Sequence, residues 1–286
     1  MDIELGISQT ALAGIGLLFG LLLGSFLNVV ILRLPAQLKG NWRRDSRDFL
    51  GLEPETEESV TIVAPASRCP VCKTPIKPHD NIPLYSYLFL KGRCKFCSAP
   101  ISIQYPLVEL LAGLLAAYFA YQYGLSSTTF YSLIFSYSLL VLAGIDIHEK
   151  LLPDQITLPL MWLGLFANLS GTFVSLNESV IGASAGYLSL WCVFWAFKLI
   201  TGKEGMGYGD FKLLAALGAW MGWHMLPMII LLSTATGAIV GIAGIVFIGR
   251  NKDMPMAFGP FLAAAGWLAF VWGDKILSGY LSLFNF

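Results

Sequence analysis

Residues 9–32 read QTALAGIGLLFGLLLGSFLNVVIL and contain no charged side chain. A bilayer core about 30 Å thick is crossed by roughly 20 mostly apolar residues in a helix, so this stretch is long enough for one span. The rest of the chain has the same character: of its 286 residues, 56% are hydrophobic and 13% are charged, with a mean hydropathy of +0.68. This composition excludes an ordinary soluble domain and indicates an integral membrane protein.

The same length criterion predicts an all-α polytopic membrane protein with about eight transmembrane helices. The expected spans are 9–32, 106–123, 128–147, 156–172, 178–199, 211–224, 226–248 and 257–273. The sixth span is short and its border with the seventh is poorly defined, so a total of seven or nine spans is also compatible with the sequence. No basic segment precedes the first apolar run and no small-residue cleavage site follows it, so we expect no removable signal peptide.

Glycines recur every four residues in three of these spans. They are Gly16, Gly20 and Gly24, then Gly182 and Gly186, then Gly237 and Gly241. Such spacing lets helix backbones approach closely in lipid, where no hydrophobic effect drives helices together. The repeats therefore predict a tightly packed bundle, without indicating which helices pair.

The basic residues predict the orientation in the membrane. With the N-terminus outside, all of the 18 lysine and arginine residues except Lys275 lie at or near the cytoplasmic face. The loop 33–105 is longer than the loops for which the positive-inside rule is strongest, but the short later loops give the same answer. Because topology accounts for the cations, we expect the lipid bilayer, and no nucleic acid, as a partner.

Two copies of a C-x-x-C-x-x-P-I motif lie in the polar loop 33–105, CPVCKTPI at 69–76 and CKFCSAPI at 94–101. Paired knuckles of this kind close a tetrahedral site, which predicts one structural zinc ion. Its candidate ligands are Cys69, Cys72, Cys94 and Cys97. Disulfides are disfavoured in the reducing cytoplasm, whereas iron–sulfur ligation stays open. The stretch 37–60 is mostly polar and builds little core, so a metal would stabilise the loop.

Two aspartates fall at the expected cytoplasmic ends of spans. The third span ends in LAGIDIHEKLLPD at 142–154, and the loop before the sixth ends in GMGYGD at 205–210. Asp146 and Asp210 thus share an expected depth, and charges near hydrocarbon are candidates for function because they are costly. Two facing carboxyls would share one proton, so that one activates a water and the other stabilises the oxyanion of an attacked peptide bond.

Structural explanations stay open for these carboxylates. Asp210 could be the N-cap of the sixth helix, and Asp146 a solvated residue at a helix end. Asp154 suits a capping role as well as a functional one. The three glycines of the GMGYGD hexapeptide permit positive φ and close backbone approach, which would let an extended substrate strand lie beside the aspartate.

Two further polar residues lie within or beside apolar spans. Glu109, in the first turn of the second span, is explained by the dipole of that helix. Asn28, near the cytoplasmic end of the first span, could bond to another helix or line a pocket.

Several stretches together resemble the bifunctional type IV prepilin peptidases, which are bacterial membrane aspartyl proteases that also methylate their product. They are GSFLNVVILRLP at 24–35, SRCPVC at 67–72 with CKFC at 94–97, IDIHEKLLPD at 145–154 and GMGYGDFKLLAALGAW at 205–220. The resemblance covers nearly the whole chain. It implies that Asp146 and Asp210, which match the family's two catalytic aspartates, act as the dyad.

The resemblance further implies a substrate and a second activity. Leader peptides of prepilins and pseudopilins would be cut after a glycine at the cytoplasmic face of a bacterial inner membrane. The new N-terminal residue, usually Phe, would then be N-methylated from S-adenosylmethionine, an activity that the family associates with the cysteine loop. No G-x-G-x-x-G turn is present, so the sequence does not indicate which residues bind this donor.

The chain is therefore expected to have three parts: a first transmembrane helix at 1–32, a cytoplasmic zinc-binding loop domain at 33–105, and a protease bundle of about seven helices at 106–286. A secondary transporter is the main alternative, with sites near the midplane and inverted repeats. A third alternative makes the loop a docking platform and the helices its anchor.

Overall fold

The computed structural model describes residues 8–53, 60–77, 82–249 and 256–283. Its internal contacts divide the chain into two units, residues 1–137 (unit 1) and 138–286 (unit 2). The border falls inside one helix, α4 (Ser127–Glu149). Each unit is described below by itself.

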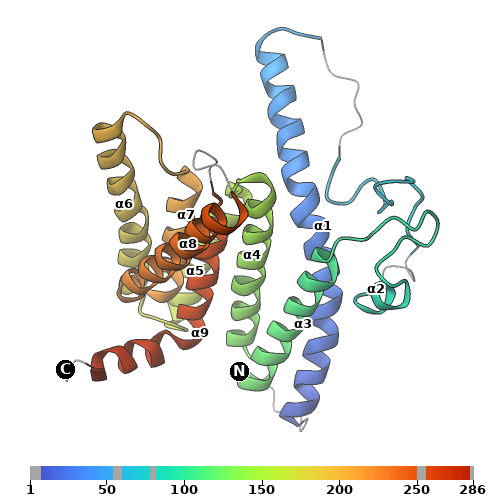
Figure 1. The fold of residues 1–286 in the computed structure, drawn as a ribbon. Helices are drawn as coiled ribbons and strands as arrows, with labels where there is room; N and C mark the ends of the chain where they lie inside the picture. Colours follow the sequence, from blue (N-terminus) through green and yellow to red (C-terminus); the bar gives the residue numbers. More distant parts are fainter. Residues whose placement is uncertain (1–7, 54–59, 78–81, 250–255, 284–286) are drawn as a thin grey trace. The chain divides into compact units, whose positions relative to one another are not determined.

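Eight helices in the described residues correspond to the eight predicted spans, which confirms an all-α polytopic membrane fold (Figure 1). They are α1 (Gln9–Phe49), α3 (Gln104–Tyr123), α4 (Ser127–Glu149), α5 (Asp154–Ala167), α6 (Leu176–Thr201), α7 (Tyr208–Met221), α8 (Leu226–Ile248) and α9 (Gly259–Leu283). By length and composition, α1, α4, α6, α8 and α9 could each cross a membrane. Helices α5 and α7, with 14 residues each, are only about 21 Å long.

Unit 1 is built around α1 and α3, which run side by side (Figure 1). Helix α1 begins at its N-cap Ser8, whose hydroxyl accepts a hydrogen bond from the Ala11 N–H. It continues well past residue 32, where the predicted span ends, and includes Pro35. Proline removes one helix hydrogen bond, but the polar residues that follow it include several good helix formers, so the helix extends to Phe49.

The glycine repeat of α1 faces α3. A Cβ on Gly16 would lie 2.7 Å from the Ala116 carbonyl oxygen, and one on Gly24 would lie 2.6 Å from the Glu109 Cα. No real side chain tolerates such distances, so only glycine permits this approach of the two backbones. The expected tight packing is confirmed for this helix pair.

Unit 2 surrounds α7. Helices α5, α6 and α9 all contact it, and its residues from Leu213 to Met221 are buried. A Cβ on Gly186 of α6 would lie 2.5 Å from the Leu214 carbonyl oxygen, and Gly182 and Gly218 face each other through their backbones. The short α7 is thus enclosed by protein rather than lipid, which explains how 14 residues suffice.

The glycines of α8 pack differently. A Cβ on Gly237 would lie 3.6 Å from the Phe261 ring, and one on Gly241 would lie 3.4 Å from the end of the Met256 side chain. These are ordinary van der Waals distances to side chains. Among the described residues, the third glycine repeat therefore does not bring two backbones together.

Polar contacts fix the C-terminal end of α7. The indole N–H of Trp220 donates to the Leu160 carbonyl of α5 at 2.8 Å. The Asn168 amide, which follows α5, donates to the Ala219 carbonyl at 3.0 Å and accepts from the Phe173 N–H at 3.1 Å. Because buried polar groups are costly unless paired, these bonds specify one register of α7. The register of its first turn, which carries Asp210, follows from it.

Candidate metal centre and candidate active site

The two cysteine motifs fold into matching knuckles in unit 1. In the first, the Cys69 N–H donates to the Thr74 carbonyl and the Lys73 N–H donates back to the Cys69 carbonyl. In the second, the Cys94 N–H donates to the Ala99 carbonyl and the Ser98 N–H to the Cys94 carbonyl. The residue after each second cysteine has positive φ, 58° at Lys73 and 57° at Ser98. The repeated sequence thus gives a repeated turn that turns both thiols of a knuckle to one side.

The four thiols converge. The Sγ atoms of Cys69, Cys72, Cys94 and Cys97 all lie within 4.8 Å of one another, and those of Cys69 and Cys97 are 3.8 Å apart. Zinc–sulfur bonds of about 2.3 Å in a tetrahedron place sulfurs roughly 3.8 Å apart, so the donor set fits a closed metal site. All five cysteines of the chain are free of disulfides, and the cluster could hold a metal ion.

Hydrogen bonds favour the thiolate form of Cys72 and Cys94, which is the form that binds metal, whereas burial and the neighbouring thiols raise the pKa of Cys97 to about 11. The side chain and the backbone N–H of Thr74 donate to Cys72 and lower its pKa to about 6. The backbone N–H groups of Cys97 and Phe96 lower the pKa of Cys94.

Asp146 lies near the C-terminal end of α4, in unit 2, and is only 5% exposed. Its Oδ2 accepts a hydrogen bond of 2.9 Å from the Gly259 N–H, which is the first residue of α9. The N-terminus of a helix favours a negative charge through its unpaired N–H groups and its dipole. Asp146 is therefore no solvated residue at a helix end, and the interpretation of it as solvated is wrong.

Asp210 lies in the first turn of α7 and is 8% exposed. The N-cap of α7 is Gly207, and the Asp210 N–H donates to the Gly207 carbonyl. The alternative that Asp210 caps this helix is therefore wrong. The backbone N–H of Gly207 donates a hydrogen bond to its carboxyl, and the nearby Asp146 acts on it electrostatically.

Leu152 joins the two aspartates into one site. A Cβ on Gly259, the hydrogen-bond donor to Asp146, would lie 3.0 Å from Leu152 Cδ2, and one on Gly209, the neighbour of Asp210, would lie 2.8 Å from Leu152 Cβ. The ends of α4, α7 and α9 therefore meet around a single buried leucine. The structure thus brings together the carboxyls that the sequence predicts to lie at one depth, and both belong to unit 2.

For the glycines of GMGYGD we expected positive φ and close approach, and the structure shows only the close approach. Gly205, Gly207 and Gly209 do not have positive φ. Gly205 packs on the Phe197 ring and Gly209 on Leu152, so each is needed for close packing. A Cβ on Gly207 would meet nothing nearer than the Asp210 Oδ2 at 4.0 Å, which leaves open space beside that carboxyl.

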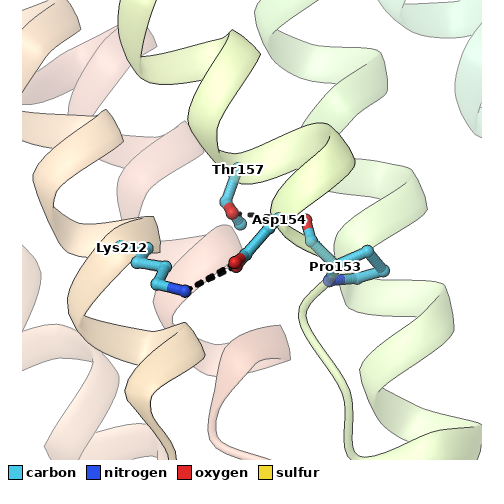
Figure 2. A network of polar contacts seen from close by, with 4 residues as sticks. All are labelled: Pro153, Asp154, Thr157 and Lys212. Carbon is cyan, nitrogen blue, oxygen red and sulfur yellow. Dashed lines mark hydrogen bonds and ion pairs between the residues drawn. The ribbon is translucent and has the colours of Figure 1, made fainter. Parts of the chain in front are cut away.

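Asp154 is the first residue of α5 and makes an ion pair with α7. Its two carboxylate oxygens each lie 2.7 Å from the Lys212 Nζ (Figure 2). In the same turn the Thr157 hydroxyl donates to the Pro153 carbonyl, 3.2 Å away. Lys212 lies two residues after Asp210, so this pair ties the start of α5 to the turn that carries Asp210. The side chain of Asp154 is half exposed, and such pairs contribute about 1 kcal/mol or less.

Sequence reasoning missed Gly259 and Leu152. Their signals are weak: Gly259 precedes Pro260 at a helix start, a common N-terminal pattern, and Leu152 is one leucine among many. Only the folded structure shows that both contact the same site.

Two family models match most of the chain. A model described as the bacterial peptidase A24 N-terminal domain matches residues 18–123, and one described as the type IV leader peptidase family matches residues 133–242. No solved structure matches the chain.

Curated relatives match nearly end to end. A prepilin leader peptidase/N-methyltransferase of Pseudomonas aeruginosa is 51% identical over 94% of this chain and 93% of its own. Proteins of the same name from Aeromonas hydrophila and Xanthomonas campestris are 52% and 47% identical, over 93% and 98% of this chain and 93% and 97% of theirs. The two family models follow each other along the chain and cover both the cysteine knuckles and the aspartate pair. The chain therefore belongs to the type IV leader peptidase family.

Proposed function

We propose that this multi-pass membrane protein is a prepilin leader peptidase and N-methyltransferase whose peptidase site is the pair Asp146 and Asp210. The relatives that match nearly its full length carry both activities in their name. The observation that supports the site best is the meeting of two buried carboxyls, from helix ends far apart in sequence, around Leu152. Buried carboxyls with electrostatic coupling have the properties of an aspartyl protease dyad.

The two carboxyls have different surroundings, which suggests different roles. Asp146 accepts the Gly259 N–H at the start of α9, and this favours its ionised form. The ionised Asp146 is the base that takes a proton from the attacking water. A second negative charge beside Asp146 is unfavourable, so Asp210 carries the shared proton and donates a hydrogen bond to the oxygen of the attacked carbonyl.

The open space beside Gly207 is where we place the substrate backbone. A prepilin leader is a basic segment followed by an apolar helix, so its junction would rest at the membrane surface. We propose that the site faces the cytoplasm, with the N-terminus in the periplasm of a bacterial inner membrane. Cleavage then follows a glycine of a prepilin or pseudopilin, and the new N-terminal residue, usually Phe, is N-methylated from S-adenosylmethionine.

We also propose that Cys69, Cys72, Cys94 and Cys97 hold one structural zinc ion. Four thiolates leave no open coordination position, so the metal would stabilise the knuckles and take no part in the chemistry. The 3.8 Å separation of two of the sulfurs supports this assignment.

The peptidase role is tested by Asp210→Asn. Because the amide keeps the shape but cannot share a proton, we expect cleavage of a prepilin to slow by about a thousandfold or more. Methylation of an already cleaved pilin by the same preparation should persist. Asp274→Asn, an exposed carboxylate of α9, is the matched control, and retained cleavage by Asp210→Asn would contradict the assignment.

The positioning of Asp146 is tested by Gly259→Ala. The added Cβ would lie 2.7 Å from the Asp146 Oδ2, so the carboxylate must shift and cleavage should slow by tenfold or more, on the order expected for small misplacements. Gly279→Ala, where a Cβ on the same helix would meet nothing within 4 Å, serves as the control. Equal cleavage rates for the two variants, measured at saturating prepilin, would show that this hydrogen bond is not needed.

The metal assignment is tested by elemental analysis of the purified protein. We expect one zinc per chain, lost in Cys72→Ser and kept in Cys192→Ser, together with a lower unfolding temperature for Cys72→Ser. Iron in place of zinc, with visible absorption, would favour the iron–sulfur alternative.

A further inference from the structure

Unit 1 contains a cavity that the peptidase proposal does not use. Its volume is about 490 Å³, and its walls come from α1, both cysteine knuckles, the segment 82–90 and α3. Cavities of this size are typical of sites for small molecules. All of its lining residues belong to unit 1, whereas both aspartates belong to unit 2.

Asn28 gives this cavity an unpaired acceptor. The side chain is 1% exposed, and its nitrogen donates to the carbonyl oxygens of Gly24 and Tyr105. Because both partners can only accept, they fix which end of the amide is nitrogen. The Asn28 Oδ1 is then a buried acceptor without a donor among the described residues. Such a group is costly to bury unless a ligand or water completes it.

Glu109 gives the cavity a buried carboxylate. It is 7% exposed, and its Oε2 accepts from the Leu84 N–H at 2.9 Å. Leu84 has a φ of 56°, unusual for a residue with a side chain, so the backbone is bent to bring this donor to the carboxylate. Ser25 supplies a second hydrogen bond, but no described lysine or arginine forms an ion pair with Glu109. Contrary to our expectation, Glu109 lies beyond the first turn of α3, which begins at Gln104, so the dipole of that helix does not account for it.

Arg33 supplies the opposite charge on another wall. Its guanidinium donates hydrogen bonds of 3.4 Å to the Thr61 and Ile62 carbonyls, and no described carboxylate forms an ion pair with it. The cavity thus presents a carboxylate, an unpaired carbonyl-type oxygen and a guanidinium. This set complements a molecule with positive charges and one carboxylate.

We propose that this cavity binds the methyl donor S-adenosylmethionine, with Glu109 and the Asn28 Oδ1 facing its positive charges and Arg33 facing its carboxylate. The donor carries a sulfonium, an α-ammonium and an α-carboxylate, so its charges match those of the walls. The inference rests on the proposed N-methyltransferase function and names the site for it. It also gives a reason for a metal ion to stabilise the knuckles, because residues beside Cys69 and Cys94 line the same cavity.

Binding of the donor to the purified full chain in detergent, measured by calorimetry, tests this proposal without relying on activity. We expect Glu109→Gln, which keeps the shape and removes the charge, to weaken S-adenosylmethionine binding at least tenfold. Asp45→Asn, an exposed carboxylate of α1, should leave the affinity unchanged. Equal affinity of Glu109→Gln and the unmodified chain would overturn the site while leaving the methyltransferase function in place.

A second measurement needs no substitution and so does not depend on folding of a variant. Irradiation of the unmodified chain with radiolabelled S-adenosylmethionine should label peptides that contain residues 25–33 or 105–109. Labelling confined to unit 2 would overturn the site. No binding at all to the unmodified chain would instead remove S-adenosylmethionine as the donor, and the site with it.

Discussion

The hydrogen bond from the Gly259 N–H to the Asp146 carboxylate is the contact on which the proposed peptidase site depends. It holds the end of α4 against the start of α9, and it forms only because residue 259 has no side chain. Leu152 then fills the space between Gly259 and Gly209, which sets the first turn of α7 and its Asp210 beside the same carboxylate. Glycine at these contacts serves close packing more than unusual backbone conformation. The same principle places α1 against α3 and α6 against α7.

Two different solutions to buried charge occur in the two units. In unit 2, two carboxyls lie near each other, an arrangement that favours one shared proton and suits peptide hydrolysis. In unit 1, a single carboxylate and an unpaired amide oxygen line a cavity beside the cysteine knuckles. The second arrangement leaves the Asn28 Oδ1 without a donor among the described residues, which a bound cation would supply. This difference is why we assign the two activities to separate sites.

Much of this could be predicted from the sequence, because its signals are local. Long apolar runs predicted the eight helices, the spacing of the cysteines predicted their convergence, and the equal depth of Asp146 and Asp210 predicted that they would be neighbours. Contacts between distant segments left no such signal. Neither the Gly259 donor, nor the filling role of Leu152, nor the cavity around Glu109 could be read from residue types alone. We did not predict that α1 extends past Pro35. The predicted end was taken from the length of chain that crosses a bilayer, and the helix continues beyond that length.

The pH dependence of prepilin cleavage by the unmodified protein tests the central claim most directly. A dyad that needs one ionised and one protonated carboxyl loses its base when pH falls and both carboxyls protonate, and loses its acid when pH rises and both ionise. The account predicts a rate at saturating substrate that falls on both sides of a maximum. A rate that rises to a plateau through a single ionisation would contradict a shared-proton pair.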